Sequence, residues 1–312
     1  MIKKSHPAFS LIEVVFVLVI LGVVASISSS IIVQVYENLI TQRAMYKVTT
    51  KTELVSNQIV NRLTYRIQGT SVAKDSSKTG FVEDTDWIML KNIPKYDNNF
   101  TTIEWIGYDN DSFSASETPG WSGVTDYSTA NRFSVTTPAS QLSKTANIMN
   151  NLSNGKVTMS DNSHAAAILF SQKTNYYIED TEYNPSCMGL IDPSKTACIF
   201  RVTNNEDTNL TFVDNKPIII SERYKLAWSA YALVPIDEDP VGDGLYNLYL
   251  YYNYQPWNGE RYTSGIKKRM ATNISVFKFT ENGGVIQFKL CASENIGQKY
   301  NISTCKEKAI IR

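Results

Sequence analysis

Apolar residues are concentrated in one long run near the amino terminus. Residues 14–33 are 20 consecutive positions without a charged side chain. A helix rises about 1.5 Å per residue, so this run covers roughly 30 Å, the thickness of the hydrocarbon core of a bilayer. Lys3 and Lys4 precede the run and place the amino terminus in the cytoplasm by the positive-inside tendency. We therefore expect a single-pass membrane anchor whose remaining chain is exported.

The pattern after this run predicts that the helix continues. Residues 34–68 contain no Gly or Pro, and their apolar positions recur mostly at steps of four, which makes a stripe on one helical face. Gly69 is a natural stop. One helix over residues 11–68 would be about 87 Å long. A coiled coil is the alternative, but the heptad pattern is not sustained. The stripe comprises Tyr36, Ile40, Ala44, Val48, Val55, Ile59, Leu63 and Ile67.

Residues 69–312 have the short alternating segments of a mostly β domain, which makes the chain α+β. Asn282-Gly283-Gly284 between two apolar segments predicts a hairpin, because these residues tolerate positive φ. Residues 138–152 predict a short helix closed by Asn154-Gly155, and residues 70–86 and 109–137 predict loops. Strands are expected at 87–90, 102–108, 166–170, 198–202, 217–221, 224–233, 245–254, 276–280 and 285–290.

All four cysteines follow the apolar run and form two local pairs, with 10 and 13 residues between their members. Export favours disulfides, and closing short loops costs the least entropy. We therefore expect Cys187–Cys198 and Cys291–Cys305, although four cysteines allow three pairings. A zinc site of four thiolates lacks any C-x-x-C spacing. Free buried thiols are the other alternative.

The amino terminus resembles the class III signal of type IV pilins and type II secretion pseudopilins. That signal is a short basic leader, a small residue that is normally Gly, and then Phe-Thr-Leu-Ile-Glu. Here Ala8 precedes Phe9-Ser10-Leu11-Ile12-Glu13. The resemblance implies that prepilin peptidase cuts between Ala8 and Phe9 and that the new terminus, Phe9, is N-methylated. Ala8, Ser10 and Ser30 depart from the usual Gly, Thr and helix-kinking Pro.

Glu13 is the residue of this motif with an expected role. A carboxylate among apolar helices costs a few kcal/mol unless it is paired or protonated. The amino terminus of a neighbouring subunit can neutralise it and so fix the register between subunits. Alternatively, Glu13 marks the membrane interface and reaches the headgroups. The motif as a whole favours the register role.

The resemblance also implies an organisation and a function. It divides the chain into a leader (1–8), a transmembrane or filament-core helix (9–33), its amphipathic continuation (34–68) and an exported β-rich domain (69–312). Segments in the second half resemble the larger minor pilins and J-type minor pseudopilins, whose subunits start assembly at the filament tip. The expected localisation is the bacterial inner membrane with a periplasmic domain, and then the tip of a pilus or pseudopilus. The expected partners are other pilin-like subunits, prepilin peptidase and the inner-membrane assembly platform.

Other candidate chemistry is sparse. Asp237, Asp239 and Asp243 lie in an acidic turn that offers oxygen ligands for Ca²⁺ but lacks EF-hand spacing, so a solvated turn is the simpler interpretation. His164 is the only exported histidine and lies in a polar turn. No hydrolase, phosphate-loop or dinucleotide motif is present, so we expect no enzyme and no cofactor. The alternative function is a membrane-anchored periplasmic binding module or hydrolase that uses the helix only as a tether.

Charge does not favour nucleic-acid binding. Removal of Lys3 and Lys4 with the leader leaves 28 of the 30 basic residues against 30 acidic ones. Residues 267–269 (Lys-Lys-Arg) are the only dense basic run. Three charges give a modest, salt-sensitive attraction to phosphates and no sequence specificity.

Overall fold

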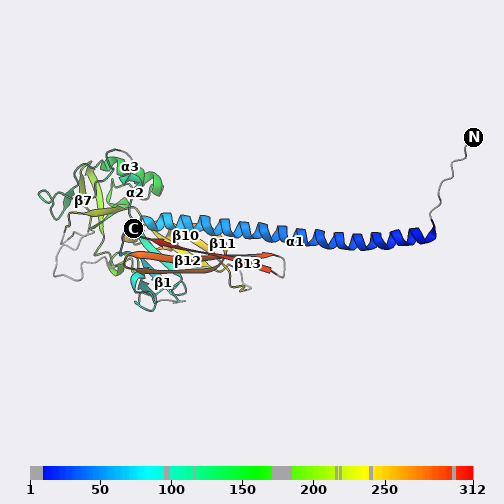
Figure 1. Cartoon of the computed structure of the whole chain (residues 1–312). Coiled ribbons are helices and arrows are strands. Elements are labelled where there is room, and N and C mark those ends of the chain that lie inside the picture. Colours follow the sequence, from blue (N-terminus) through cyan, green and yellow to red (C-terminus); the bar gives the residue numbers. More distant parts are fainter. Residues whose placement is uncertain are drawn as a thin grey trace, which may run out of the picture.

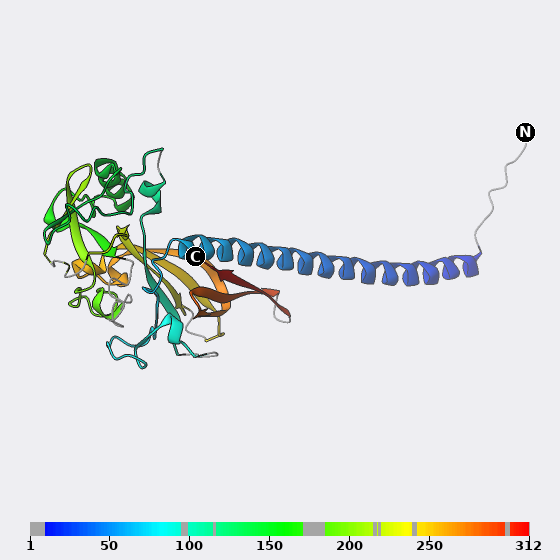
Figure 2. The same cartoon turned by 60° about the vertical axis from the view of Figure 1, so that its left-hand side comes forward.

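A helix of 54 residues, α1 (Leu11–Thr64), dominates the structure and is about 81 Å long. The structure is a computed structural model that describes residues 10–94, 99–114, 117–170, 185–214, 217, 220–238, 242–296 and 300–311. Part of α1 lies against the β domain, and its amino-terminal part projects away from it in two views (Figures 1 and 2). The predicted α+β fold, with a long amino-terminal helix before an antiparallel β domain, is confirmed.

The helix ends four residues before the predicted position 68. Ile67 donates its backbone N–H to the carbonyl of Ile106 at 2.8 Å, and Arg66 forms a β-bridge with Gly107. Residues 66 and 67 pair with Ile106 and Gly107 because the neighbouring strand on that side pairs only as far as Glu104. The backbone groups of residues 106 and 107 are therefore available on that side. Gly69, with φ of 81°, then forms the following turn instead of the helix stop.

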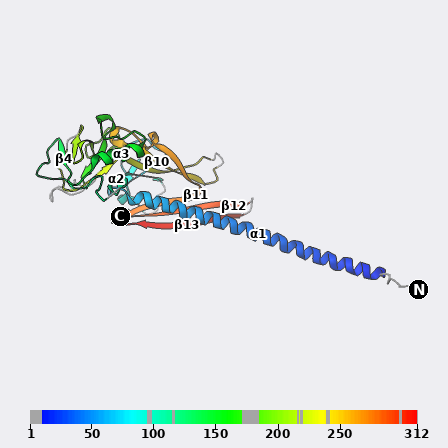
Figure 3. The same cartoon turned by 90° about the horizontal axis from the view of Figure 1, so that it is seen from above.

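The packed half of α1 begins later than the amphipathic pattern predicted. Every residue from 10 to 43 is exposed, including Tyr36 and Ile40 of the predicted stripe, and Ala44 is the first buried residue. From there the stripe is buried as expected at Val48, Val55, Ile59, Leu63 and Ile67. The reason is the length of the sheet, because α1 lies along the last strands of the chain only over this half (Figure 3).

Sheet 1 has eight antiparallel strands in the order β13-β12-β11-β10-β9-β3-β1-β2. One face packs against the buried stripe of α1, with Leu233, Leu250, Phe277 and Leu290 in the shared core. The predicted hairpin joins β11 to β12 through Gly283 and Gly284, both at positive φ. The strands of sheet 1 are β1 (Val72–Lys74), β2 (Trp87–Met89), β3 (Thr102–Gly107), β9 (Ser229–Ile236), β10 (Tyr246–Tyr254), β11 (Ile266–Asn282), β12 (Val285–Ile296) and β13 (Tyr300–Ile310).

Residues 108–228 are an insertion between β3 and β9 of sheet 1. Gly107 and Ser229 are register partners, so the inserted chain leaves and returns at adjacent positions. The insertion contains sheet 2, in the order β4-β7-β6-β5-β8, and the helices α2 (Asn110–Phe113) and α3 (Leu142–Ser153). The strands of sheet 2 are β4 (Ser134–Thr136), β5 (Ala166–Phe170), β6 (Phe200–Glu206), β7 (Asn209–Phe212) and β8 (Tyr224–Ala227).

The insertion has its own core and also covers the second face of sheet 1. Trp121, Leu142 and Tyr224 belong to the inner core of the insertion. Met188 and Leu190 pack with residues of β9 and β10 in a separate cluster between the two parts. Five 3₁₀ helices complete the described elements: Leu90–Asn92, Asn162–His164, Pro185–Cys187, Pro256–Asn258 and Tyr262–Ser264.

Several predicted boundaries are wrong for identifiable reasons. The predicted strand 224–233 is two strands in different sheets, separated at Trp228, whose carbonyl accepts a hydrogen bond from Gln255 at 3.0 Å. The predicted helix 138–152 begins only at Leu142, because Asp207 caps its first turn through Leu142 and Ser143. The predicted loops contain β1, α2 and β4. Residues 218–219 of the predicted strand 217–221 lie outside the described residues, and its other residues are in no strand.

Candidate functional site

The first turn of α1 places Glu13 in a capping box. Ser10 is the N-cap, and its hydroxyl oxygen accepts a hydrogen bond from the backbone N–H of Glu13 at 3.3 Å. The carboxylate of Glu13 accepts one from the backbone N–H of Ser10, also at 3.3 Å. Two donors that the helix start would leave unpaired are thereby satisfied. The box uses only Ser10 and Glu13, so removal of the leader would preserve it.

Ala8 and Phe9, the residues of the expected cleavage and methylation, lie outside the described residues. Helix α1 begins two residues after Phe9, at Leu11, with Ser10 as its N-cap. Within the described residues, α1 is the one helix that is long and apolar enough to cross a membrane. Its apolar side chains from Leu11 to Val33 are all exposed. An apolar surface of this size is stable only under a non-aqueous cover, which is either lipid or other apolar helices.

The packed half of α1 is fastened to the end of the chain by ion pairs. Glu53 contacts the ammonium groups of Lys306 and Lys308, each at 3.0 Å, and Lys51 lies 3.5 Å from Glu294 on β12. Hydrogen bonds from Lys308 and Lys306 lower the pKa of Glu53 to about 2. The helix is therefore held against β12 and β13 by charge as well as by its buried stripe.

Both expected disulfides are present. Cys291 and Cys305 are direct register partners on β12 and β13, with their Cα atoms 4.0 Å apart. Cys187 and Cys198 have Cα atoms 5.3 Å apart and close the segment that packs on the second face of sheet 1. The first disulfide joins the strands that hold α1, and the second fixes the insertion where it meets sheet 1.

The acidic turn considered for Ca²⁺ uses its carboxylates locally. Asp243 accepts a hydrogen bond from the backbone N–H of Leu245 at 2.8 Å. Glu238 accepts hydrogen bonds from Asn247 and Tyr249, each at 2.6 Å. Asp239 lies outside the described residues. Over the described part of the chain, no group of three or more His, Cys, Asp or Glu residues could hold a metal ion, and Asp237 and Asp243 join no such group.

His164 belongs to a local turn. Its Nδ1 lies 2.8 Å from the carboxylate of Asp161, which also accepts a hydrogen bond from the hydroxyl of Ser163 at 2.6 Å. These hydrogen bonds, with that of Ser163 first, lower the pKa of Asp161. The contact Ser163 Oγ to His164 Nδ1, at 3.0 Å, uses the same ring nitrogen as Asp161. A Ser-His-Asp triad needs the two partners on opposite nitrogens, so this group is not one.

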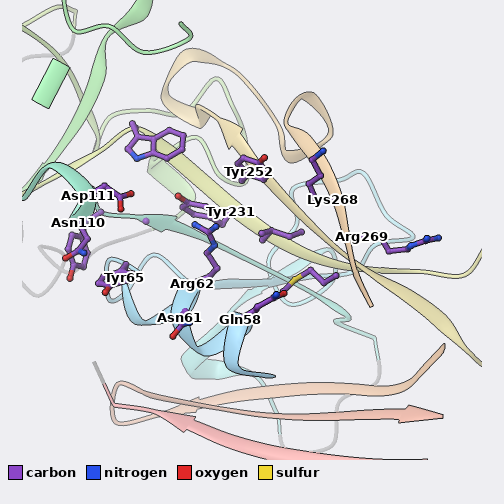
Figure 4. Close-up of a pocket in the computed structure, with 15 residues that line it drawn as sticks. Gln58, Asn61, Arg62, Tyr65, Asn110, Asp111, Tyr231, Tyr252, Lys268 and Arg269 are labelled. Carbon is purple, nitrogen blue, oxygen red and sulfur yellow. The ribbon is translucent and has the colours of Figure 1, made fainter. Parts of the chain in front are cut away.

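A cavity of about 560 Å³ lies between the end of α1, the root of the insertion and strands β9 to β11 (Figure 4). Arg62 points into it toward Tyr231, whereas Arg269 points away from it. The basic run 267–269 is thus divided, because alternate residues of β11 face opposite sides. Sequence reasoning missed this cavity. Its residues come from five separated segments, and no local pattern connects them.

Comparison with known proteins identifies the amino-terminal segment alone. Residues 3–29 match the family model described as the prokaryotic N-terminal methylation motif. No curated protein and no solved structure gives a significant match. The matched segment comprises most of the leader, the Glu13 capping box and most of the exposed apolar part of α1. The chain therefore carries the prokaryotic N-terminal methylation motif, which is the signal of type IV pilins and pseudopilins, at the start of a pilin-like long helix.

Proposed function

We propose that this chain is a non-enzymatic minor subunit of a type IV filament, which primes or caps a type IV pilus or a type II secretion pseudopilus. The observation that carries this proposal is the exposure of every residue from 10 to 43, a segment that begins within the methylation motif at residues 3–29. In the proposal, lipid covers this surface in the inner membrane, and helices of other subunits cover it after assembly. The bulky periplasmic domain suits a filament tip better than a repeated shaft.

Glu13 supports a mechanism for adding the subunit in register. Both of its hydrogen bonds to Ser10 use Oε2, which leaves Oε1 for the amino terminus of a neighbouring subunit. A carboxylate among apolar helices is costly without such a partner, so subunits that dock in the paired register are favoured over those that do not. Cleavage before Phe9 would supply the amino group that makes this pair.

The test compares substitutions at two carboxylates of α1. We expect Glu13→Ala to insert normally into the membrane and to lose incorporation into filaments, because the register pair is absent. Glu37→Ala is the matched control, since Glu37 is an exposed carboxylate on the same helix outside the motif, and it should assemble normally. Filament fractions and cross-linking to partner subunits measure both. Unchanged assembly of Glu13→Ala would refute the register role.

The cavity beside Arg62 favours a second candidate, a periplasmic binding module that uses α1 only as a tether. The two candidates differ in what they require of the apolar helix. A tether works with any membrane anchor of similar length, whereas a filament subunit needs its own motif. Replacement of residues 1–33 by an unrelated transmembrane helix should therefore abolish function for a subunit and preserve it for a tethered module.

A further inference from the structure

The cavity at the end of α1 is formed by one helical face and the floor of sheet 1. Gln58, Asn61, Arg62 and Tyr65 recur at steps of three and four residues, so they share one face of α1. Tyr231 on β9 and Tyr252 on β10 lie on the face of sheet 1 that packs against the helix. Figure 4 shows Arg62 between these two sets of side chains, reaching from α1 toward Tyr231.

Arg62 is a positioned cation without a carboxylate partner among the described residues. Its guanidinium carbon lies 5.8 Å from the ring centroid of Tyr231, within the range of a cation–π contact. Tyr231 is itself fixed, because it stacks on Trp105 at a centroid distance of 5.8 Å and meets Trp228 edge-on at 6.4 Å. Lys267, by contrast, has a carboxylate partner, because its ammonium group lies 3.8 Å from Glu238 as well as over the ring of Tyr249. Arg62 is thus held in place and still has its hydrogen-bond donors available.

The floor of the cavity excludes a peptide bound by strand addition. Strand β9 lies between β3 and β10, and β10 lies between β9 and β11. No free strand edge is present at this floor, so the backbone of a peptide would find no row of donors and acceptors there. The helical wall comes from the last turns of α1, where the helix dipole is negative. That end offers no backbone N–H groups to an anion, so a negative charge on the ligand has to be held by the side chain of Arg62.

The lining side chains fit an acidic sugar, because three basic residues (Arg62, Lys268 and Arg269) line the cavity against one acidic residue, Asp111. Planar amides such as Gln58 and Asn61 form hydrogen bonds with hydroxyl groups, and aromatic rings such as Tyr65 and Tyr252 pack against the C–H face of a sugar ring. A guanidinium binds a carboxylate through two parallel hydrogen bonds. The volume of about 560 Å³ is within the range of small-molecule sites. Gln58 lies 25 residues beyond Val33, or about 38 Å along α1, so the cavity lies well outside the membrane.

We propose that this cavity binds an acidic sugar residue, whose carboxylate pairs with Arg62 and whose C–H face packs on the rings of Tyr65 and Tyr252, while Tyr231 holds the guanidinium of Arg62 in place. The site is independent of filament membership, because none of these residues belongs to the methylation motif or to the exposed half of α1. Failure of either proposal therefore leaves the other intact.

The experiment is calorimetric titration of the full chain in detergent micelles. The acidic probes are methyl β-glucuronide, N-acetylneuraminic acid and trigalacturonic acid, and the neutral probe is methyl β-glucoside, which matches the first acid without its charge. We expect at least one of the three acids to bind. If methyl β-glucuronide binds, methyl β-glucoside should bind at least about tenfold more weakly, because the hydrogen bond between the charged carboxylate and Arg62 is lost. Absence of binding by all three acids would overturn the proposal.

Substitutions locate the site. Arg62→Gln should weaken binding of the acid at least about tenfold. Arg43→Gln, on the exposed part of the same helix, should leave it unchanged. Tyr252→Leu keeps apolar contact with the core but removes the ring, and should weaken acidic and neutral probes alike. Circular dichroism checks that each variant is folded. The proposal is contradicted if Arg62→Gln binds the acid as tightly as the unsubstituted chain does. It is also contradicted if inorganic phosphate or pentaglutamate binds as tightly as the acidic sugar and this binding depends on Arg62.

Discussion

Two carboxyl groups at β3 are buried in different ways. Glu104 is only 1% exposed and pairs with the ammonium group of Lys74, and the hydroxyl of Tyr254 donates to it at 2.8 Å. Asp109 is fully buried just after β3 and accepts a hydrogen bond from the backbone N–H of Ser112 at 3.2 Å. Burial raises the pKa of Asp109 to about 7. The first carboxyl is therefore compensated by a cation, whereas the second is stabilised mainly in its neutral form.

Asp109 should make the stability of the folded chain depend on pH. The folded state keeps the proton up to about pH 7, and the unfolded state loses it near its ordinary pKa of 3.8. The folded state therefore binds more protons between these values, and the free energy of unfolding falls as pH rises through this range. We expect Asp109→Asn to remove this pH dependence. Its free energy of unfolding should exceed that of the unsubstituted chain by up to about 4 kcal/mol at pH 8 and should differ little from it at pH 4.

Urea unfolding followed by tryptophan fluorescence at both pH values measures this difference. The difference between the free energies of unfolding of the two proteins at each pH is independent of the other titrating groups, such as Glu53. A difference that is the same at pH 4 and pH 8 would show that Asp109 is ionised in the folded state.

Glu104 should be costly to remove. Glu104→Ala leaves the partly buried ammonium group of Lys74 and the hydroxyl of Tyr254 without their acceptor, so we expect a loss of about 3–5 kcal/mol in the free energy of unfolding. Glu307→Ala, which breaks the exposed pair with Lys289, is the control and should have little effect. Urea unfolding of both variants measures the losses. Equal effects would mean that the buried pair contributes no more than a surface pair.

At the scale of elements, one helix lies in two environments. Up to residue 43 every side chain of α1 is exposed, on all sides of the helix. From Ala44 the helix carries a single buried stripe. Hydropathy and periodicity predict both halves, because each depends only on residues near in sequence. The point of transition depends on how far the hairpin of β12 and β13 reaches along the helix. That length is a tertiary property, and the pattern alone placed the transition about ten residues too early.

The disulfide between β12 and β13 should stabilise this hairpin against α1. Cys291 and Cys305 close a loop of 13 intervening residues, so the double substitution Cys291→Ser, Cys305→Ser should lower the free energy of unfolding by about 3 kcal/mol. Thermal unfolding followed by circular dichroism measures the loss. Strand β13 should also exchange its backbone amides faster in the variant. Unchanged stability and exchange would show that the Glu53 ion pairs and the buried stripe are sufficient by themselves.

Strand β13 shows where sequence reasoning fails. Its centre carries Lys306, Glu307 and Lys308, which give no apolar alternation, so it was not predicted. Its structure comes from pairing with β12 along its whole length and from contacts of Lys306 and Lys308 with Glu53. Strands β1 and β4 have three residues each and are too short for a period-two pattern. The disulfide pairs were predictable because their loops are short.

At the scale of the whole molecule, the chain joins a membrane-compatible rod to a two-sheet domain. The amino-terminal motif was predictable because it is contiguous, and residues 3–29 match its family model. The inserted sheet and the cavity at its root were not predictable, because they depend on the return of the chain at Ser229 beside Gly107. The rod is long and apolar enough to cross a membrane, and in the proposed function the large domain suits the filament tip.

Mass spectrometry of the amino terminus of the native protein tests the central claim most directly. The proposed filament subunit is processed before assembly, so we predict a chain that begins at N-methylated Phe9 and is recovered with other pilin-like subunits. Deletion of prepilin peptidase should leave the unprocessed form in the membrane. A native chain that begins at Met1 and is found without partner subunits would contradict the account.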